Sequence, residues 1–361
     1  DGNICRCTGY KSIEKAAMLV AEQLQARKRG DAISFAMEKK MLPEYFSGIK
    51  EKLRVLQGLR LTMPTLSVGI PTSALRNVGT PDSRLPTLPI GGGTDLYVQQ
   101  HDEIKDAAIR FLFDHPELNG IRKEGNDCII GPSATVSDLL NSPVINEAFP
   151  SFPGYAKLVS STPIRNMATI AGNFVNASPI GDLTIFFLAL DAQLTLTPSP
   201  SPQGGEGSSP VSKRVIPLRQ FYKGYKQLDK KPGEQIVSIS FKLPDKYDYF
   251  NFEKVSKRTH LDIATVNSGI SIRMNGDVIA EAGLSAGGVG PVPMYLQKTS
   301  AYLKGRTLRQ AQDDETISGA IEVMKTEISP ISDVRGSKEY KTLLLRQLMK
   351  AHLIPLLDKK V

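Results

Sequence analysis

Residues 161–182 read Ser-Thr-Pro-Ile-Arg-Asn-Met-Ala-Thr-Ile-Ala-Gly-Asn-Phe-Val-Asn-Ala-Ser-Pro-Ile-Gly-Asp. The stretch is dense in small residues, which let a backbone approach a flat or charged group because no side chain projects in the way. Short polar side chains stand among them, namely Thr162, Arg165, Asn166, Asn173, Asn176 and Asp182. An apolar run at 183–190 follows, so we expect polar loops resting on a packed core. The pattern indicates either a preformed cofactor site or a tightly packed turn whose polar groups are satisfied.

Length and charge limit the possible classes of protein. The 361 residues predict two or three domains, at roughly 150 residues per domain. The net charge of +8 is scattered along the chain and forms no basic stripe with aromatic residues, which argues against nucleic-acid binding. No apolar run reaches the roughly 18 residues that cross a bilayer, and the first residues are unlike a signal peptide. We therefore expect a cytoplasmic protein without a membrane span.

Hydrophobic patterns predict an α+β fold. Strands are expected at 85–90, 109–113, 120–123, 128–130, 193–197, 214–217, 235–242, 249–257, 264–274 and 277–286. Helices are expected from Ser12 to near Gly30 and at 48–56, 134–140, 301–303, 316–324 and 339–353, and 145–158 is expected to be largely helical but broken by Pro150 and Pro153. The Pro/Ser/Gly-rich segment 198–212 is expected to be an insertion in a hairpin loop. The last third of the chain predicts an antiparallel sheet with flanking helices.

A glycine-rich turn follows the strand expected at 85–90. In Gly91-Gly92-Gly93-Thr94-Asp95 the backbone amides can all point at one anion, although three glycines also suit an ordinary turn. Lys254 lies in a strand pattern further along, where a solvent-facing position is the ordinary expectation.

The cysteines suggest a partial metal site. Cys5 and Cys7 are one residue apart and could present two thiolates to a metal or an iron–sulfur cluster, but a cluster needs twice as many. Cys128 lies in an apolar strand pattern and is expected to be a small buried residue.

Several blocks of sequence resemble one family in their order along the chain. IGGGTDL (90–96), TPIRNMATIAGNFVNASPIGD (162–182) with LALDAQLTL (188–196), and SDVRGSKEYK (332–341) resemble the FAD-binding domain of molybdenum hydroxylases. GNICRCTGY (2–10) resembles the end of their 2Fe-2S domain, and this fused segment is most similar to the xanthine dehydrogenase branch. The resemblance implies the FAD-binding domain fold of that family, built from two α+β subdomains.

The resemblance also implies a domain plan. It gives a C-terminal helical remnant of a 2Fe-2S domain at 1–30, a linker at 31–60, a FAD-binding domain at 61–245 and a C-terminal domain of the flavoprotein module at 246–361. Cys5 and Cys7 would be the last two cluster ligands, so we expect a chain truncated within its 2Fe-2S domain and holding an incomplete ligand set.

The site residues follow from the same resemblance. The glycine-rich segment would surround the FAD pyrophosphate, and Lys254 would lie near the isoalloxazine ring. The full set of implied FAD-binding residues is Ile90, Gly91, Gly92, Gly93, Thr94, Asp95, Leu96, Thr169, Gly172, Asn173, Asp182 and Lys254. Asp262 is expected close to the flavin, and His260 is expected at the surface.

The implied function is electron transfer. FAD would accept electrons from 2Fe-2S clusters and pass them as hydride to NAD, while a partner subunit carries the molybdenum cofactor and hydroxylates the substrate. No catalytic side chain is then needed. One alternative is the FAD subunit of a carbon monoxide, nicotinate or aldehyde dehydrogenase, against which the fused segment at 2–10 argues. Another is a flavin-free assembly subunit, which would predict a damaged glycine-rich turn.

Overall fold

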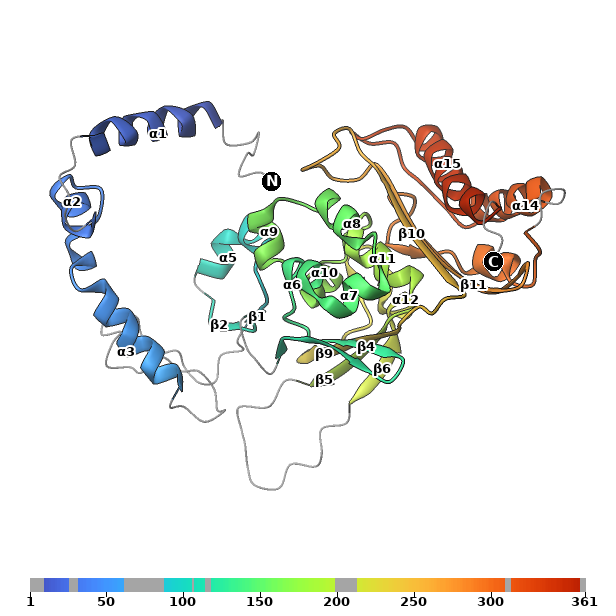
Figure 1. Ribbon diagram of the computed structural model, residues 1–361, viewed down its shortest axis with the longest axis horizontal. Helices are drawn as coiled ribbons and strands as arrows, with labels where there is room; N and C mark the ends of the chain where they lie inside the picture. The colour runs from blue at the N-terminus through green and yellow to red at the C-terminus, as the bar shows by residue number, and fades with distance from the viewer. Residues whose placement is uncertain are drawn as a thin grey trace, which may run out of the picture. The chain divides into compact units, whose positions relative to one another are not determined.

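The computed structural model describes residues 10–25, 32–61, 88–105, 107–113, 118–198, 213–308 and 313–357. It divides into a small unit, Ile4–Asp82, and a large unit formed by Ser83–Val361 with Asp1–Asn3. The small unit, taken by itself, contains helices α1 (Tyr10–Gln25), α2 (Ala32–Glu38) and α3 (Ile49–Leu61) and a short 3-10 turn at Glu44–Phe46 (Figure 1). Helices were expected at α1 and α3, whereas α2 lies in a polar stretch where we predicted none.

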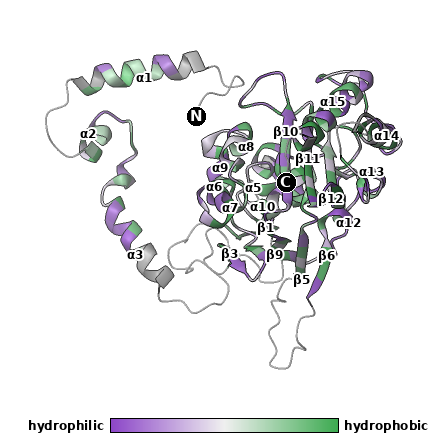
Figure 2. Cartoon of the chain, turned by 45° about the vertical axis from the view of Figure 1, so that its right-hand side comes forward, coloured by the Kyte–Doolittle hydropathy of each residue, from purple (hydrophilic) through white to green (hydrophobic). Residues whose placement is uncertain are grey.

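The first sheet of the large unit is antiparallel and five-stranded, in the order β3-β4-β9-β5-β6. Its strands are β3 (Ile121–Glu124), β4 (Asp127–Ile130), β5 (Gln193–Pro198), β6 (Arg214–Pro217) and β9 (Glu234–Lys242). Leu194 and Leu196 of β5 point into the core because alternate residues of a strand face opposite sides. Hydrophobic and hydrophilic bands alternate along the strands for the same reason (Figure 2). The hairpin of β5 and β6 encloses 199–212, which lie outside the described residues.

Smaller elements complete this half of the unit. A parallel pair is formed by β1 (Leu88–Ile90) and β2 (Ile109–Phe111), and the chain between them forms α4 (Leu96–Gln99) and α5 (His101–Lys105). Helix α12 (Leu218–Phe221) leads into the hairpin β7 (Tyr222–Gly224) and β8 (Gln227–Leu228).

A group of short helices lies on one side of the five-stranded sheet (Figure 1). They are α6 (Val136–Asn141), α7 (Pro143–Ala148), α8 (Phe152–Leu158), α9 (Thr162–Met167), α10 (Ile170–Asn176) and α11 (Asp182–Ala189). Our expectation of polar loops over 161–182 is wrong, because α9, α10 and the start of α11 occupy this stretch. Pro163 fits the first turn of α9, where no amide is needed, and Ala177 ends α10 with φ +51°. The helical stretch expected over 145–158 is interrupted near its prolines, as predicted, with Pro153 in the first turn of α8.

The second sheet has the order β10-β11-β12-β13 and is also antiparallel. Its strands are β10 (Asp248–Val255), β11 (Val266–Asn275), β12 (Val278–Gly287) and β13 (Met294–Tyr295), followed by helices α13 (Gln297–Leu303), α14 (Asp313–Lys325) and α15 (Lys338–Leu357). This confirms the α+β class and the sheet with flanking helices that the sequence predicts.

Helix α11 joins the two halves of the large unit. It is buried along its length after Asp182 and packs against β11 and β12. Glycines make this contact possible, since a Cβ added at Gly283 would lie 2.4 Å from the carbonyl oxygen of Ala189. Among the described residues, no helix combines the length and the apolar character that a membrane crossing requires.

Candidate functional site

The glycine-rich turn leaves the end of β1 as a half-exposed loop. In the part of the chain that the structure describes, the amides of residues 91–95 donate to no acceptor. Gly92 lies against the helix α9 end, where an added Cβ would be 1.5 Å from the carbonyl oxygen of Met167. Gly93 has φ +68°, which a residue with a side chain adopts only with strain. Successive backbone amides without an acceptor among the described residues are donors of the kind that can bind an anion such as phosphate.

Thr169 connects this loop to α10. Its Oγ1 accepts a hydrogen bond from the amide of Gly172 at 3.2 Å and so caps the helix. An added Cβ at Gly91 or at Gly172 would lie 2.6 Å from the same oxygen. One turn further on, Asn173 Oδ1 accepts from the Thr184 hydroxyl at 2.9 Å. The predicted residues of the two motifs, about 80 positions apart in sequence, therefore lie in direct proximity.

A hydrogen-bonded chain holds the far end of the loop. Asn176 Nδ2 donates to Asp95 Oδ2 at 2.7 Å, and the Lys226 ammonium donates to Asn176 Oδ1 at 3.0 Å and to its backbone oxygen. Lys226 comes from the turn between β7 and β8. The cation thus lies at the C-terminal end of α10, where the helix dipole favours positive charge.

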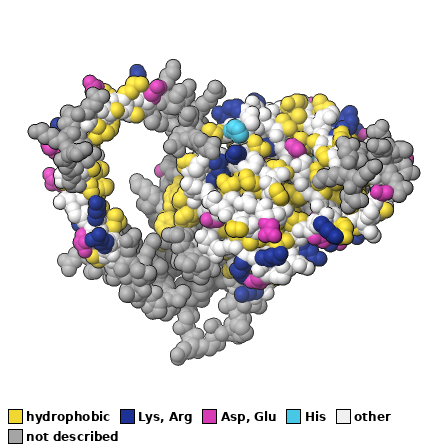
Figure 3. Space-filling model, viewed as in Figure 1, with side chains coloured by type: hydrophobic (Ala, Val, Ile, Leu, Met, Phe, Trp, Pro, Cys, Tyr) yellow, Lys and Arg dark blue, Asp and Glu magenta, His cyan; other side chains and the backbone are white. Residues whose placement is uncertain are grey.

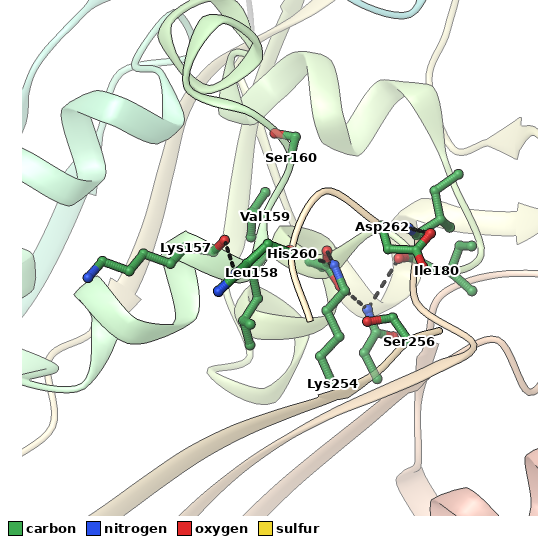
Figure 4. Close-up of polar contacts among 12 residues, drawn as sticks. Lys157, Leu158, Val159, Ser160, Ile180, Lys254, Ser256, His260 and Asp262 are labelled. Carbon is green, nitrogen blue, oxygen red and sulfur yellow. Dashed lines mark hydrogen bonds and ion pairs between the residues drawn. The ribbon is translucent and has the colours of Figure 1, made fainter. Parts of the chain in front are cut away.

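Lys254 is buried, contrary to the ordinary expectation for a strand lysine. Its side chain is 2% exposed, and its ammonium lies 2.6 Å from Asp182 Oδ2 and 2.7 Å from the carbonyl oxygen of Leu158. Asn267 Nδ2 donates to the other oxygen of Asp182 at 2.6 Å. Burial raises the pKa of Asp182, and the adjacent Lys254 cation opposes that rise. Figure 4 shows the lysine side chain running from β10 toward the turn at 157–160.

The loop after β10 is folded by its own hydrogen bonds. Asp262 accepts from the backbone amide of Arg258 at 2.9 Å, which folds the loop back on itself. His260 is exposed, as expected, and its Nδ1 lies 3.3 Å from the carbonyl oxygen of Lys157 (Figure 4). Asp262 and His260 thus lie on the loop that follows Lys254 and the end of β10 along the chain.

Two polar residues of the 161–182 stretch form hydrogen bonds within the protein. The buried guanidinium of Arg165 donates to the carbonyl oxygens of Val159 and Ser160, both at 2.8 Å, and to the Thr162 hydroxyl. Asn166 Oδ1 accepts from the Ser137 hydroxyl at 2.5 Å. At these two positions the interpretation as satisfied polar groups is correct.

The cysteines give no metal site in the described part of the chain. Cys5 and Cys7 lie outside the described residues. Cys128 is fully buried in β4, as expected, and burial raises the pKa of its thiol to about 12. Within the described ranges, no group of three or more His, Cys, Asp or Glu side chains could hold a metal ion.

Acidic and basic side chains are interspersed on the face drawn in Figure 3.

Two residues of the site escaped the sequence analysis. Asn267 and Lys226 reach Asp182 and Asn176 across more than 45 positions of sequence. Asn267 had a weak signal, because it is an amide side chain in a strand pattern over 264–270 that otherwise holds apolar residues, glycine and two small hydroxyl residues. Lys226 had none, since it stands in a polar turn with other lysines.

Two protein-family models match the chain. "FAD binding domain in molybdopterin dehydrogenase" matches residues 72–244, and "CO dehydrogenase flavoprotein C-terminal domain" matches residues 251–355. The chain belongs to the family of FAD-binding subunits of molybdenum hydroxylases. The resemblance drawn from the sequence blocks is thereby confirmed at the level of the family.

The similar proteins are named as chains or subunits of several different dehydrogenases. The carbon monoxide dehydrogenase medium chain of Afipia carboxidovorans is 29% identical over 64% of this chain and 75% of its own length. The nicotinate dehydrogenase FAD-subunit of Eubacterium barkeri is 26% identical over 76% of this chain and 90% of its own length. A putative xanthine dehydrogenase FAD-binding subunit of Escherichia coli K12 is 25% identical over 72% of this chain and 85% of its own length. Reconstituted CO dehydrogenase from Oligotropha carboxidovorans superposes with a TM-score of 0.64 at 26% identity, covering 74% of this chain and 88% of that chain. These values do not favour xanthine dehydrogenase over the other types.

Proposed function

We propose that this FAD subunit holds the pyrophosphate of FAD on residues 90–96 and the rest of the cofactor along Thr169, Gly172, Asn173, Asp182 and Lys254. The observation that carries the proposal is the run of amides at 91–95, which donate to no acceptor among the described residues and pack against the end of α9 and the start of α10. These residues fit the group, because pyrophosphate needs several donors at close range and a backbone without side chains in the way.

The chain's own residues bind and orient the cofactor. The amides of the glycine-rich turn offset the phosphate charge, and Thr169 fixes the distance between that turn and α10. Lys254 supplies a buried positive charge whose position is set by Asp182 and the Leu158 carbonyl. Such a charge stabilises added negative charge nearby, because a low-polarity surrounding screens it weakly. When bound, the flavin supplies the redox chemistry, exchanging electrons with one-electron and two-electron partners.

The wider role follows from the family. The subunit takes electrons from 2Fe-2S centres and returns them as hydride to NAD, beside a partner subunit that carries the molybdenum cofactor. The substrate of the whole enzyme is proposed to be xanthine, on the single ground that residues 2–10 resemble the end of a fused 2Fe-2S domain. Relatives named for carbon monoxide and nicotinate are equally similar, so this choice depends on that segment alone. No step is assigned to Cys5 or Cys7.

A glycine substitution tests the proposed site. Gly92→Ala places a Cβ onto the carbonyl oxygen of Met167, so the turn must move and the amides lose their arrangement. We expect FAD affinity to fall at least about 100-fold, since several phosphate hydrogen bonds are lost together at about 1.5–3 kcal/mol each. Gly154→Ala in α8 is the matched control, because an added Cβ there meets nothing within 4 Å. Equal FAD affinity of the two variants would contradict the proposed site.

The electron acceptor needs a separate measurement. Anaerobic addition of NADH to the FAD-loaded chain should bleach the flavin absorbance if NAD is the acceptor. Flavin that is bleached by dithionite and remains oxidised with NADH would refute the NAD assignment and leave FAD binding intact.

A further inference from the structure

The segment 330–337, between α14 and α15, is a rigid loop. Backbone hydrogen bonds join Asp333 and Gly336 in both directions, at 3.0 and 3.1 Å. The Lys341 ammonium donates to the carbonyl oxygen of Ile331 at 2.9 Å and pairs with Asp333 at 2.8 Å, although its side chain is only 3% exposed. Lys257, from the loop after β10, donates to the carbonyl oxygen of Val334 at 2.7 Å. The loop is thus fixed at its base, its middle and its tip.

This rigid loop presents apolar side chains to solvent. Ile331 is 72% exposed and Val334 is 83% exposed. Single exposed apolar residues are common on protein surfaces and need no explanation. Here the buried Lys341 holds the backbone of Ile331 and the exposed Lys257 holds that of Val334. This is a different case, because a surface fixed in advance loses little conformational freedom when a partner binds.

An open groove of about 430 Å³ adjoins the loop, between the end of α14 and the start of α15. Pro330 and Leu343 line its apolar part, and Lys325, Lys338 and Arg346 line its charged part together with Glu339. Lys325 pairs with Glu322 at 2.6 Å, and Lys338 lies 3.7 Å from Glu339. The lining carries more cations than carboxylates, and Lys257 adds a further cation at the loop tip.

We propose that this docking surface, meaning the loop 330–337 and the groove beside it, binds an acidic face of another subunit of the same enzyme. The apolar tip would enter that face while its carboxylates meet the cations of the groove, since charges of opposite sign set the register of an interface. The proposal rests on the proposed function, because the relatives include proteins named medium chains, which are parts of larger enzymes.

Carbodiimide cross-linking of the purified holoenzyme tests the contact directly, because this reagent joins lysine amines to carboxylates that touch them. Peptide mass spectrometry should find Lys325, Lys338 or Lys257 joined to aspartate or glutamate of a different chain. Lys298, an exposed lysine of α13, serves as the control and should show no such link. The proposal would be overturned if the links were confined to this chain or to a second copy of it. It would also be overturned if the holoenzyme contained no other chain.

A pair of matched variants keeps the proposal falsifiable. Val334→Asp should reduce recovery of the other subunits with the tagged chain at least about tenfold, while Val215→Asp, on the exposed face of β6, should leave recovery unchanged. FAD content and melting temperature of both variants should equal those of the parent. If the parent lacks FAD, the proposed function fails, whereas the cross-links and recoveries still decide the docking surface. Equal recovery of the two variants would refute the docking surface.

Discussion

The pair of Asp182 and Lys254 shows what a single buried contact does in this molecule. Asp182 begins α11 in the first half of the large unit, and Lys254 stands on β10 in the second half. Both charges have left water, and the loss of hydration is offset by their mutual attraction and by the hydrogen bonds from Asn267 and to Leu158. The sequence could not predict this burial, because the two residues are 72 positions apart and each stands in an ordinary local pattern.

Removing one member of the pair should be costly. Lys254→Met leaves the carboxylate of Asp182 buried without its cation, and we expect the free energy of unfolding to fall by about 3–5 kcal/mol. Urea denaturation of the FAD-free protein measures the change. Lys298→Met, at an exposed position, is the control and should stay within about 0.5 kcal/mol of the parent. If the double variant Asp182→Asn, Lys254→Met loses the full sum of both single losses, the two residues do not stabilise each other.

His352 gives the large unit a dependence on pH. Its ring is fully buried against β10, with Nδ1 3.1 Å from Asn251 Nδ2, and burial lowers its pKa to about 3. In the unfolded chain its pKa is about 6.5, so between these values only the unfolded state takes up the proton. The contribution to stability is therefore complete above pH 6.5 and decreases as the pH falls below it, by up to about 1.4 kcal/mol per pH unit.

Urea denaturation at pH 7, 6 and 5 checks this prediction. His352→Gln should flatten the loss of stability over this range, whereas His260→Gln, at an exposed position, should leave it unchanged. A parent protein whose free energy of unfolding is the same at pH 7 and pH 5 would show that the buried histidine does not behave in this way.

At the scale of elements, the site is formed where β1 and the short helices α9 and α10 meet. The strands were predictable because their alternation continues over several residues, as in β9 and β11. The helices were not, because α9 and α10 have only six and seven residues, so no helical periodicity develops. Their starts depend on local signals that were present, namely Pro163 and the Thr169 cap, but such signals also suit turns.

The Thr169 cap should contribute measurably to α10. Thr169→Ala removes the acceptor of the Gly172 amide, and we expect a loss of about 1 kcal/mol in the free energy of unfolding. Thr169→Ser retains the hydroxyl and should recover most of that loss. Urea denaturation of the parent and the two variants measures these differences in stability. A serine variant as unstable as the alanine variant would mean that the methyl group of Thr169 matters more than the cap.

At the scale of the large unit, α11 packs between two hydrophobic cores, and β10 contributes side chains to both of them. One core lies between the five-stranded sheet and the short helices, and the other between the second sheet and helices α13–α15. The apolar run at 183–190 predicted a buried element, but its two-sided packing depends on glycines of β11 and β12 that carried no sequence signal of their own.

Filling the space at one of these glycines should weaken the packing of α11 on the second sheet. Gly283→Ala brings a Cβ within 2.4 Å of the Ala189 carbonyl oxygen, and we expect the free energy of unfolding to fall by about 1–3 kcal/mol through overpacking. Urea denaturation measures the effect, and Gly154→Ala again serves as the control. A Gly283→Ala variant as stable as the parent would show that α11 can shift on the sheet without cost.

The central claim is that this chain binds FAD, and the most direct measurement is the identity and amount of the chromophore in the purified protein. Acid release followed by chromatography should yield FAD at about one molecule per chain, since the family fold has one such site. A colourless chain that also fails to take up added FAD would contradict the claim, and would leave a fold of this family that serves assembly without a flavin.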